Sequence, residues 1–391
     1  AAYSIGAARR HRPEHAILPE DAVVMCSFGD ASANHSTAQG AFNTAQWTSY
    51  QSVPLPLLFV CEDNGIGIST KTPKGWIEAT FSARPGLTYF KADGLDLYDT
   101  YRVAAEAAEF VRTRKKPAFL HLRTIRLYGH AGADMPTTYL PRGEVEAEEA
   151  QDPLLHSVRL LDQAGVLDAE AALAIYRETS ARVARVAGDA VKRPRLKTAP
   201  EVMASLIPPT RVCKPTNGPT PEARAEAFGA DLKAMDEPQI MSRIINWALT
   251  DLMLAHREIV MMGEDVGRKG GVYGVTQKLT ARFGQDRMID TLLDEQSILG
   301  LAIGMAQNGF VPMPEIQFLA YLHNAEDQLR GEAATLSFFS KGAFTNPMVL
   351  RIAGLGYQKG FGGHFHNDNS VAVLRDIPGL ILAVPSNGAD A

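Results

Sequence analysis

Two groups of polar residues stand directly after short apolar runs in the first part of the chain. Gly29-Asp30-Ala31-Ser32 follows one run, and Glu62-Asp63-Asn64-Gly65-Ile66 follows the next. They offer a carboxylate, an amide oxygen and a main-chain carbonyl beside glycine, a set of oxygens that suits Mg²⁺ with phosphate and water. A single Gly-Asp turn after a strand is more often a helix N-cap. The ordered pair is more specific and indicates a metal–phosphate site.

The flanking pattern predicts elements that bring these groups together. Three apolar runs predict buried strands: Ala22–Phe28, Leu55–Cys61 and Ala118–Ile125. Two segments between them predict helices: Ser36–Trp47 and Asp99–Arg114. Strands that alternate with helices predict a parallel, doubly wound α/β sheet, in which ligands bind at the carboxyl ends of the strands. Residues Glu146–Val191 are alanine-rich and are expected to be mostly helical.

A proline-rich segment separates this region from a second α/β pattern. Eight prolines lie between Lys192 and Pro238, and Lys214–Glu222 is expected to be a turn or extended stretch. Beyond it, we expect one face of an amphipathic helix to consist of Ile240, Ile244, Trp247, Ala248 and Leu252. Strands are expected at Ile259–Met262 and Met348–Ile352, with a buried helix at Ile298–Ala306.

The composition limits the classes of protein to which this chain can belong. The 391 residues carry a net charge of -5, which gives no reason to expect nucleic acid or an anionic membrane as a partner. The cysteines, Cys26, Cys61 and Cys213, show no metal or disulfide spacing, so we expect thiols that fill the core in a reducing, cytoplasmic compartment. The apolar runs are too short to span a bilayer. The chain opens in mid-pattern without Met, which predicts a fragment.

The paired strand ends resemble the Gly-Asp-Gly … Asn-Asn signature of thiamine diphosphate enzymes. The resemblance implies that Asp30 and the amide of Asn64 bind Mg²⁺, with Ile66 lending its main-chain carbonyl, and that Gly29, Ala31 and Ser32 adjoin the cofactor. Two features depart from the family pattern: Ala31 stands where glycine is usual, and the interval from Asp30 to Asn64 is longer than usual. An alanine would be strained there if the position required a positive φ.

Two further segments resemble the α subunit of 2-oxo acid dehydrogenases. These are Ala92-Asp93-Gly94-Leu95-Asp96 and the segment from Arg126 to Asp134. The second is similar to the loop that closes over the diphosphate, which implies that His130 contacts the cofactor phosphate and that Asp134 orders the loop. From the local sequence alone, His130 reads as a surface histidine in a glycine-rich loop. The next residue, Ala131, has no hydroxyl and therefore cannot be phosphorylated.

The second α/β region resembles the β subunit of the same complexes. Four segments carry the resemblance: Gly263–Gly267, Asp290–Gln296, Pro314–Phe318 and Gly362–His366. They imply that Glu295 activates the cofactor by a hydrogen bond to its aminopyrimidine ring, with Asp294 and Glu264 as competitors for the role. Tyr321 would pack against that ring, although a Tyr beside Phe318 also reads as ordinary core. His366 would be the catalytic histidine, unless His364 takes its place; Asn367-Asp368-Asn369 departs from the commoner Ser-Gln pair.

The resemblance therefore implies an α-type and a β-type part fused in one chain. The expected division is 1–191 for the diphosphate- and Mg²⁺-binding domain, 192–238 for a linker and 239–391 for the pyrimidine-binding domain, truncated at both ends. The implied activity is thiamine diphosphate-dependent oxidative decarboxylation of a 2-oxo acid, with acyl transfer to a lipoyl group of a partner acyltransferase. Because the family forms its cofactor sites between one domain of each type, a fused chain is expected to be a homodimer.

Alternatives remain open for both the substrate and the class of protein. A branched-chain 2-oxo acid is favoured, and pyruvate or acetoin dehydrogenase chemistry remains open. A transketolase shares the cofactor domains, but it should lack the phosphate loop near His130. A non-catalytic relative would be supported by Ala31, by the long interval from Asp30 to Asn64 and by the change at Asn367-Asp368. Retention of Asp30, Asn64 and Glu295 together argues against that reading, because a structural role needs none of them.

Overall fold

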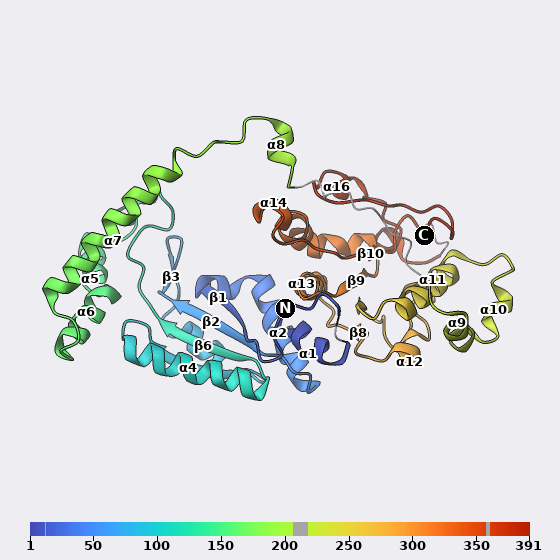
Figure 1. Cartoon of the computed structure of the whole chain (residues 1–391), viewed down its shortest axis with the longest axis horizontal. Coiled ribbons are helices and arrows are strands. Elements are labelled where there is room, and N and C mark those ends of the chain that lie inside the picture. The colour runs from blue at the N-terminus through green and yellow to red at the C-terminus, as the bar shows by residue number, and fades with distance from the viewer. Residues whose placement is uncertain (12, 206–217, 357–359) are drawn as a thin grey trace. The chain divides into compact units, whose positions relative to one another are not determined.

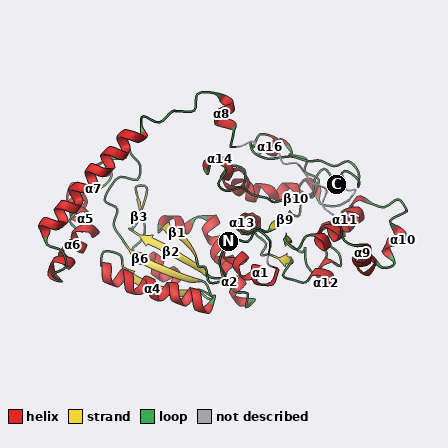
Figure 2. Cartoon of the chain, viewed as in Figure 1, coloured by secondary structure: helices red, strands yellow, loops and turns green. Residues whose placement is uncertain are grey.

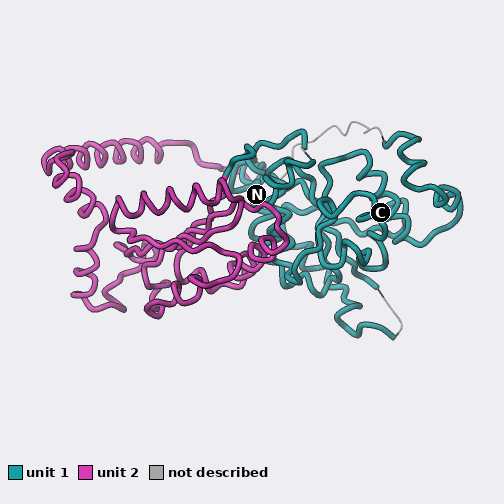
Figure 3. The backbone as a smooth tube through the Cα atoms, turned by 90° about the horizontal axis from the view of Figure 1, so that it is seen from below, with its two compact units in different colours: residues 1–22, 199–391 teal, residues 23–198 magenta. Residues whose placement is uncertain are grey.

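The computed structural model describes residues 1–11, 13–205, 218–356 and 360–391. The chain divides into two compact units, one formed by Val23–Thr198 and the other by Ala1–Ala22 with Ala199–Ala391 (Figure 3). The first 22 residues thus pack with the C-terminal half. The functional division expected at 191 and 238 stays a prediction. Residues 206–217 of the expected linker, which include Cys213, lie outside the described residues.

The unit of Val23–Thr198 is built on a four-stranded parallel sheet. Its strands are β1 (Val24–Gly29), β2 (Leu57–Asp63), β5 (Thr88–Asp93) and β6 (Ala118–Arg123), in the order β1-β2-β6-β5 (Figure 1). The predicted parallel α/β sheet is confirmed, although β5 was not foreseen. Since β1 and β2 are parallel neighbours, Asp30 and Asn64 follow adjacent strand ends at one edge of the sheet.

Helices cover both faces of this sheet, because alternate strand residues point to opposite sides. On one face, α4 (Leu97–Arg114) packs through Val103, Ala107 and Val111, which lie three to four residues apart along the helix. The other face is aromatic. There Phe42 of α2 (Ser36–Tyr50) and Phe81 of α3 (Trp76–Phe81) meet strand side chains, with the ring centroids of Phe81 and Phe119 stacked 4.2 Å apart. This is a doubly wound arrangement, as predicted.

The strand expected at Ala22–Phe28 is present as β1, but it is not buried. Met25 is 68% exposed, and Cys26 and Ser27 are also exposed. β1 is an edge strand that pairs only with β2, so no neighbouring strand covers its other side. The expectation that Cys26 fills the core is therefore wrong, whereas Cys61 in β2 is fully buried as predicted.

The alanine-rich segment after β6 is helical, as predicted. It forms α5 (Arg142–Glu149), α6 (Pro153–Gln163) and α7 (Ala169–Ala190). The unit also contains η1 (Ala31–Asn34), η2 (Pro136–Thr138) and a small antiparallel pair, β3 (Ile66–Gly67) with β4 (Thr70–Lys71). This small pair places Ile66 directly after the turn that carries Asn64.

The second unit contains another four-stranded parallel sheet. Its strands are β7 (Ile259–Gly263), β8 (Met288–Asp290), β9 (Val311–Ile316) and β10 (Arg351–Ile352), in the order β10-β9-β7-β8. Figure 2 labels β9 and β10 of this sheet. The two predicted strands are confirmed, although the strand expected at Met348–Ile352 is reduced to its last two residues. The buried helix is α13 (Glu295–Ala306), which begins three residues earlier than expected and packs with α1 (Ala2–His11).

The helix expected after the linker is present as α11 (Met241–Ala255), but its predicted buried face is largely wrong. Ile240 is 71% exposed and Leu252 is 41% exposed, and of the five predicted residues only Trp247 is buried. The core contacts come instead from Ile245, Leu249 and Met253. Both sets have helical spacing, so periodicity identified the helix and left its rotation open.

The expected linker contains helices. Three short ones are described: α8 (Ala199–Met203), α9 (Pro221–Phe228) and α10 (Asp231–Ala234). Thr220 caps α9 by accepting a hydrogen bond from the Ala223 N–H, and Pro221 occupies its first position, so these residues begin a helix rather than extend a turn. None of the described helices is long and apolar enough to cross a membrane.

The remaining elements of this unit are short. They are η3 (Val272–Gly274), α12 (Leu279–Phe283), η4 (Leu319–Ala325), η5 (Gln328–Ala333), α14 (Leu336–Phe339), α15 (Gly363–His366) and α16 (Ala372–Arg375). Two of them carry predicted site residues: η4 holds Tyr321, and α15 holds both candidate histidines.

Candidate functional site

The predicted site residues fall into two sets, one in each unit. In the unit of Val23–Thr198, Asp30 follows β1 and is only 1% exposed. Its Oδ1 accepts a hydrogen bond from the Asn64 N–H at 3.3 Å, and its Oδ2 accepts one from the Thr72 hydroxyl. The carboxylate therefore ties the end of β1 to the segment that follows β2. Thr72 was not foreseen, because nothing in its local sequence distinguishes it.

Asp30 adopts ordinary right-handed backbone at the junction of a strand and a short helix. Gly29 ends β1, and Ala31 and Ser32 begin η1. Ala31 is not at a positive φ, so the alanine introduces no backbone strain there. The methyl group has a different consequence. A Cβ on Gly67 would collide with the Cβ of Ala31, so alanine at one position requires glycine at the other.

Asn64 and Ile66 lie in one tight turn. The Asn64 Oδ1 accepts a hydrogen bond from the Ile66 N–H at 3.1 Å, and Gly65 between them has a φ of 76°. Asp30 and Asn64 thus place carboxylate and amide oxygens at one edge of the sheet, as predicted. In the part of the chain that the structure describes, no three or more His, Cys, Asp or Glu residues gather to hold a metal ion. Mg²⁺ does not require such a cluster when phosphate and water complete its shell.

The loop that carries His130 is held by Asp134. The Oδ2 of Asp134 accepts hydrogen bonds from the His130 N–H and from the Tyr139 hydroxyl, both at 2.7 Å. The Tyr139 hydrogen bond is the main cause that lowers the pKa of Asp134. Arg126 donates to the main-chain oxygen of Ile68 at 2.7 Å, which joins the loop to the segment just after Asn64. The His130 side chain itself is exposed.

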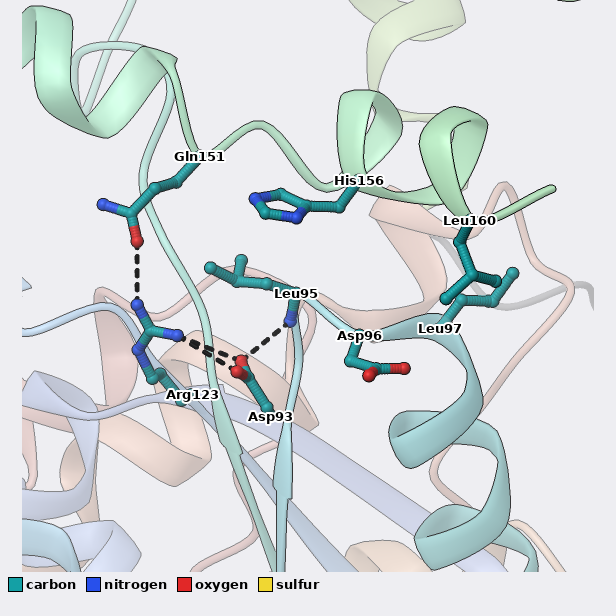
Figure 4. Close-up of a pocket in the computed structure, with 8 residues that line it drawn as sticks. All are labelled: Asp93, Leu95, Asp96, Leu97, Arg123, Gln151, His156 and Leu160. Atoms are coloured by element: carbon teal, nitrogen blue, oxygen red, sulfur yellow. Dashed lines mark hydrogen bonds and ion pairs between the residues drawn. The ribbon is translucent and has the colours of Figure 1, made fainter. Parts of the chain in front are cut away.

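A cavity of about 260 Å³ lies at the carboxyl ends of β5 and β6 (Figure 4). Its lining residues are Asp93, Leu95, Asp96, Leu97, Arg123, Gln151, His156 and Leu160. The Arg123 guanidinium donates hydrogen bonds to Asp93 Oδ1 at 3.2 Å and to Gln151 Oε1 at 2.8 Å. None of the predicted cofactor residues lines this cavity, although two of its aspartates belong to the predicted Asp-Gly-Leu-Asp segment.

In the other unit, Glu295 is the first residue of α13 and is 6% exposed. Its Oε2 accepts a hydrogen bond from the Asn324 side-chain amide at 2.6 Å. The helix expected at Ile298–Ala306 would begin after Glu295, whereas Glu295 belongs to α13 and its side chain is buried. Asn324 was not foreseen, because a single Asn carries no pattern that links it to a distant carboxylate.

Two other carboxyls compete with Glu295. Burial, and then the charge of Glu295, raise the pKa of Glu264 to about 7. The Oε1 of Glu264 is buried without a hydrogen-bond partner among the described residues. Asp294 accepts a hydrogen bond from the Ser297 hydroxyl, at the start of the same helix. The charge of Glu295 therefore acts on Glu264, and the charges of Asp265 and Asp294 add to its effect.

Aromatic side chains bring Tyr321 and His366 together. The His366 ring lies 4.4 Å from that of Phe318 and 6.0 Å from that of Tyr321, centroid to centroid. His366 Nδ1 lies 2.9 Å from the main-chain oxygen of Gly362, so this nitrogen is the donor and Nε2 remains the acceptor of the neutral ring. His364 is exposed and contacts Phe365. His366 is thus the histidine whose ring lies against both Phe318 and Tyr321.

Two family models match successive parts of the chain. The family described as "Dehydrogenase E1 component" matches residues 3–199, which is half of the chain. The family described as "Transketolase, pyrimidine binding domain" matches residues 238–391. The predicted Asp30–Asn64 set lies in the first match, and Glu295, Tyr321 and His366 lie in the second.

Curated relatives match part of the chain. The pyruvate dehydrogenase E1 component subunit beta of Staphylococcus epidermidis is 38% identical over 156 residues, which cover 39% of this chain and 46% of the relative. The 3-methyl-2-oxobutanoate dehydrogenase subunit beta of Mycobacterium tuberculosis is 36% identical over 167 residues, covering 42% and 47%. The chain thus spans about half the length of these curated relatives.

A solved structure supports the fold alone. Transketolase from Leishmania mexicana matches with a TM-score of 0.52 and 15% identity, over 96% of this chain and 54% of the transketolase chain.

Proposed function

The chain belongs to the dehydrogenase E1 component family, and from this premise we propose that it carries out thiamine diphosphate- and Mg²⁺-dependent oxidative decarboxylation of a 2-oxo acid. The observation that carries the proposal is the buried Asp30 carboxylate, which is joined to the Asn64 turn at the carboxyl edge of a parallel sheet. That edge is where open α/β sheets bind ligands.

The oxygen donors around Asp30 fit Mg²⁺. Asp30, the Asn64 side-chain oxygen and the Ile66 main-chain oxygen would hold the ion, with diphosphate and water as the remaining ligands. Gly29, Ala31 and Ser32 adjoin this position. His130 would contact the diphosphate from the loop that Asp134 orders. A single buried carboxylate with neutral oxygens suits an ion whose charge is shared with a phosphate ligand.

Thiamine diphosphate, when bound, supplies a thiazolium ring that accepts the electrons released as CO₂ leaves. Glu295 would act by a hydrogen bond to the aminopyrimidine ring, and Asn324 would fix the direction of its carboxyl group. Burial and the charge of Glu295 raise the pKa of Glu264 to about 7, so Glu264 takes up a proton more readily near neutral pH than an ordinary glutamate does. Tyr321 would pack on the pyrimidine, and His366 would move protons during acyl transfer.

The finer features of the proposal come from family resemblance. We favour a branched-chain 2-oxo acid as substrate, with pyruvate as the alternative. Relatives named for each of these two substrates match this chain. The acyl acceptor would be a lipoyl group on a partner acyltransferase. The protein would act as a homodimer in the cytoplasm.

A substrate assay tests the proposal. The full-length protein with thiamine diphosphate and Mg²⁺ is offered 3-methyl-2-oxobutanoate, pyruvate or acetoin, with an artificial electron acceptor in place of the lipoyl group. Faster reduction with 3-methyl-2-oxobutanoate than with pyruvate supports the branched-chain assignment. If none of the three gives turnover while the cofactor is bound, the proposed enzyme function is wrong.

A further inference from the structure

Three polar side chains form a hydrogen-bonded chain beneath the Asn64 turn. The Tyr89 hydroxyl lies 2.6 Å from His121 Nδ1, and His121 Nε2 lies 2.9 Å from Asp63 Oδ2. Tyr89 lies on β5, His121 on β6, and Asp63 ends β2. His121 is 5% exposed, so this polar chain crosses the otherwise apolar interior of the sheet. None of these residues belongs to the predicted cofactor set.

The partners determine the direction of the hydrogen bonds. An ionised carboxylate only accepts, so His121 Nε2 must carry the proton that is donated to Asp63. A neutral imidazole then has its lone pair at Nδ1, and Tyr89 must donate its hydroxyl proton to that nitrogen.

Asp63 uses its other carboxylate oxygen on the turn itself. Its Oδ1 accepts a hydrogen bond from the Gly65 N–H at 3.1 Å. Gly65 stands between Asn64 and Ile66, the two residues that we place on the metal ion. The backbone of Asp63 is also fixed, because its oxygen accepts a hydrogen bond from the Thr124 N–H at 2.8 Å. The Asp63 carboxylate thus bridges His121 and the Asn64–Ile66 turn.

We propose that Tyr89 and His121 are positioning residues, which hold Asp63 so that the Asn64–Ile66 turn presents its oxygens to the metal ion; the metal role itself rests on the proposed function. A carboxylate joined to only one hydrogen-bond donor can rotate, whereas Asp63 is held from both sides. Neither Tyr89 nor His121 is among the residues that would hold the ion. They act as the outer partners that orient metal ligands in many proteins.

The most informative variant is Tyr89→Phe. It keeps the aromatic ring, which stacks on Phe119 with 6.1 Å between centroids, and removes only the hydroxyl. His121 Nδ1 then no longer accepts a hydrogen bond from Tyr89. The ring can shift its proton from Nε2 to Nδ1, which leaves the lone pair of Nε2 facing Asp63. His121→Gln is the second variant, because an amide can still donate a hydrogen bond from a shorter side chain. Lys91→Met is the matched control on β5, since Lys91 pairs with Glu78 at the surface.

Two readouts separate the proposal from the function on which it rests. Hydrogen exchange of residues 64–66 in the unliganded full-length protein reports the turn without any cofactor. Titration of Mg²⁺ in the presence of thiamine diphosphate reports the ligand oxygens. Thermal unfolding of each variant shows that it is folded.

We expect faster exchange at residues 64–66 in Tyr89→Phe, and an affinity for Mg²⁺ that is about ten- to a hundredfold weaker. Lys91→Met should match the wild type in both readouts, and His121→Gln should lie between Lys91→Met and Tyr89→Phe. Unchanged exchange in a folded Tyr89→Phe overturns the proposal, and so does faster exchange with an unchanged affinity. If the wild type binds neither Mg²⁺ nor the cofactor, the proposed function fails; the metal-positioning role then fails with it, even if exchange shows that Tyr89 holds the turn.

Discussion

Asn324 donates a hydrogen bond of 2.6 Å to Glu295 and thereby fixes the carboxyl group at the start of α13. Removing the amide in Asn324→Ala should leave a buried carboxylate without this partner, at a cost of about 1–3 kcal/mol in the free energy of unfolding. Urea unfolding measures the change. His323→Ala is the control, because His323 is an exposed neighbour on the same element. Equal stability of the two variants would show that the Asn324 hydrogen bond contributes nothing.

Glu264 should make the stability of the protein depend on pH. Its pKa in the folded protein is raised to about 7 from an ordinary value of 4.5. Between these values the folded protein binds more protons than the unfolded chain, so stability falls as the pH rises through this window. Glu264→Gln removes that proton linkage. We expect the variant to gain stability relative to the wild type between pH 4.5 and 8, measured by urea unfolding.

The control for this prediction is Glu258→Gln, which removes a carboxylate elsewhere in the same unit. The difference between Glu264→Gln and the wild type should be smallest near pH 4.5 and should level off above pH 7. A difference that does not change with pH would mean that Glu264 titrates alike in the folded and unfolded states.

Ala31 and Gly67 should be coupled. A Cβ at Gly67 would occupy the space of the Ala31 methyl group, so Gly67→Ala should destabilise the protein by about 1–3 kcal/mol, the usual cost of overpacking. Ala31→Gly alone removes one methyl group and should cost less. The double variant should recover most of the loss from Gly67→Ala, because the methyl group then has room. Additive effects in the double-mutant cycle would contradict direct packing of the two positions.

The sequence predicted the parts of the fold that depend on local pattern. Apolar runs identified β2, β6 and β7, and helical composition identified α2 and α4. The buried helix expected at Ile298–Ala306 is part of α13. The rotation of α11 was wrong because two of its faces are apolar, and only tertiary contacts choose between them. The exposure of β1 could not be foreseen, because the sequence of a single strand does not reveal its position in the sheet.

The candidate site was predictable to a similar extent. A strand-end motif was enough to bring Asp30 beside Asn64, because neighbouring parallel strands end at one edge. The supporting residues were missed. Thr72, Asn324 and the Tyr89–His121 pair act through contacts between distant segments, and none belongs to a local motif. His121 alone carried a signal, as a polar residue inside an apolar strand.

The most direct test of the account is calorimetric titration of thiamine diphosphate into the full-length protein, with and without Mg²⁺. The wild type should bind only weakly without Mg²⁺. Asp30→Asn keeps the shape of the side chain and removes its charge, so it should lose the Mg²⁺-dependent binding. Glu295→Gln should still bind the cofactor while its turnover falls about 10²–10⁴-fold. Binding by Asp30→Asn that equals the wild type, or no binding by the wild type with Mg²⁺ present, would contradict the account.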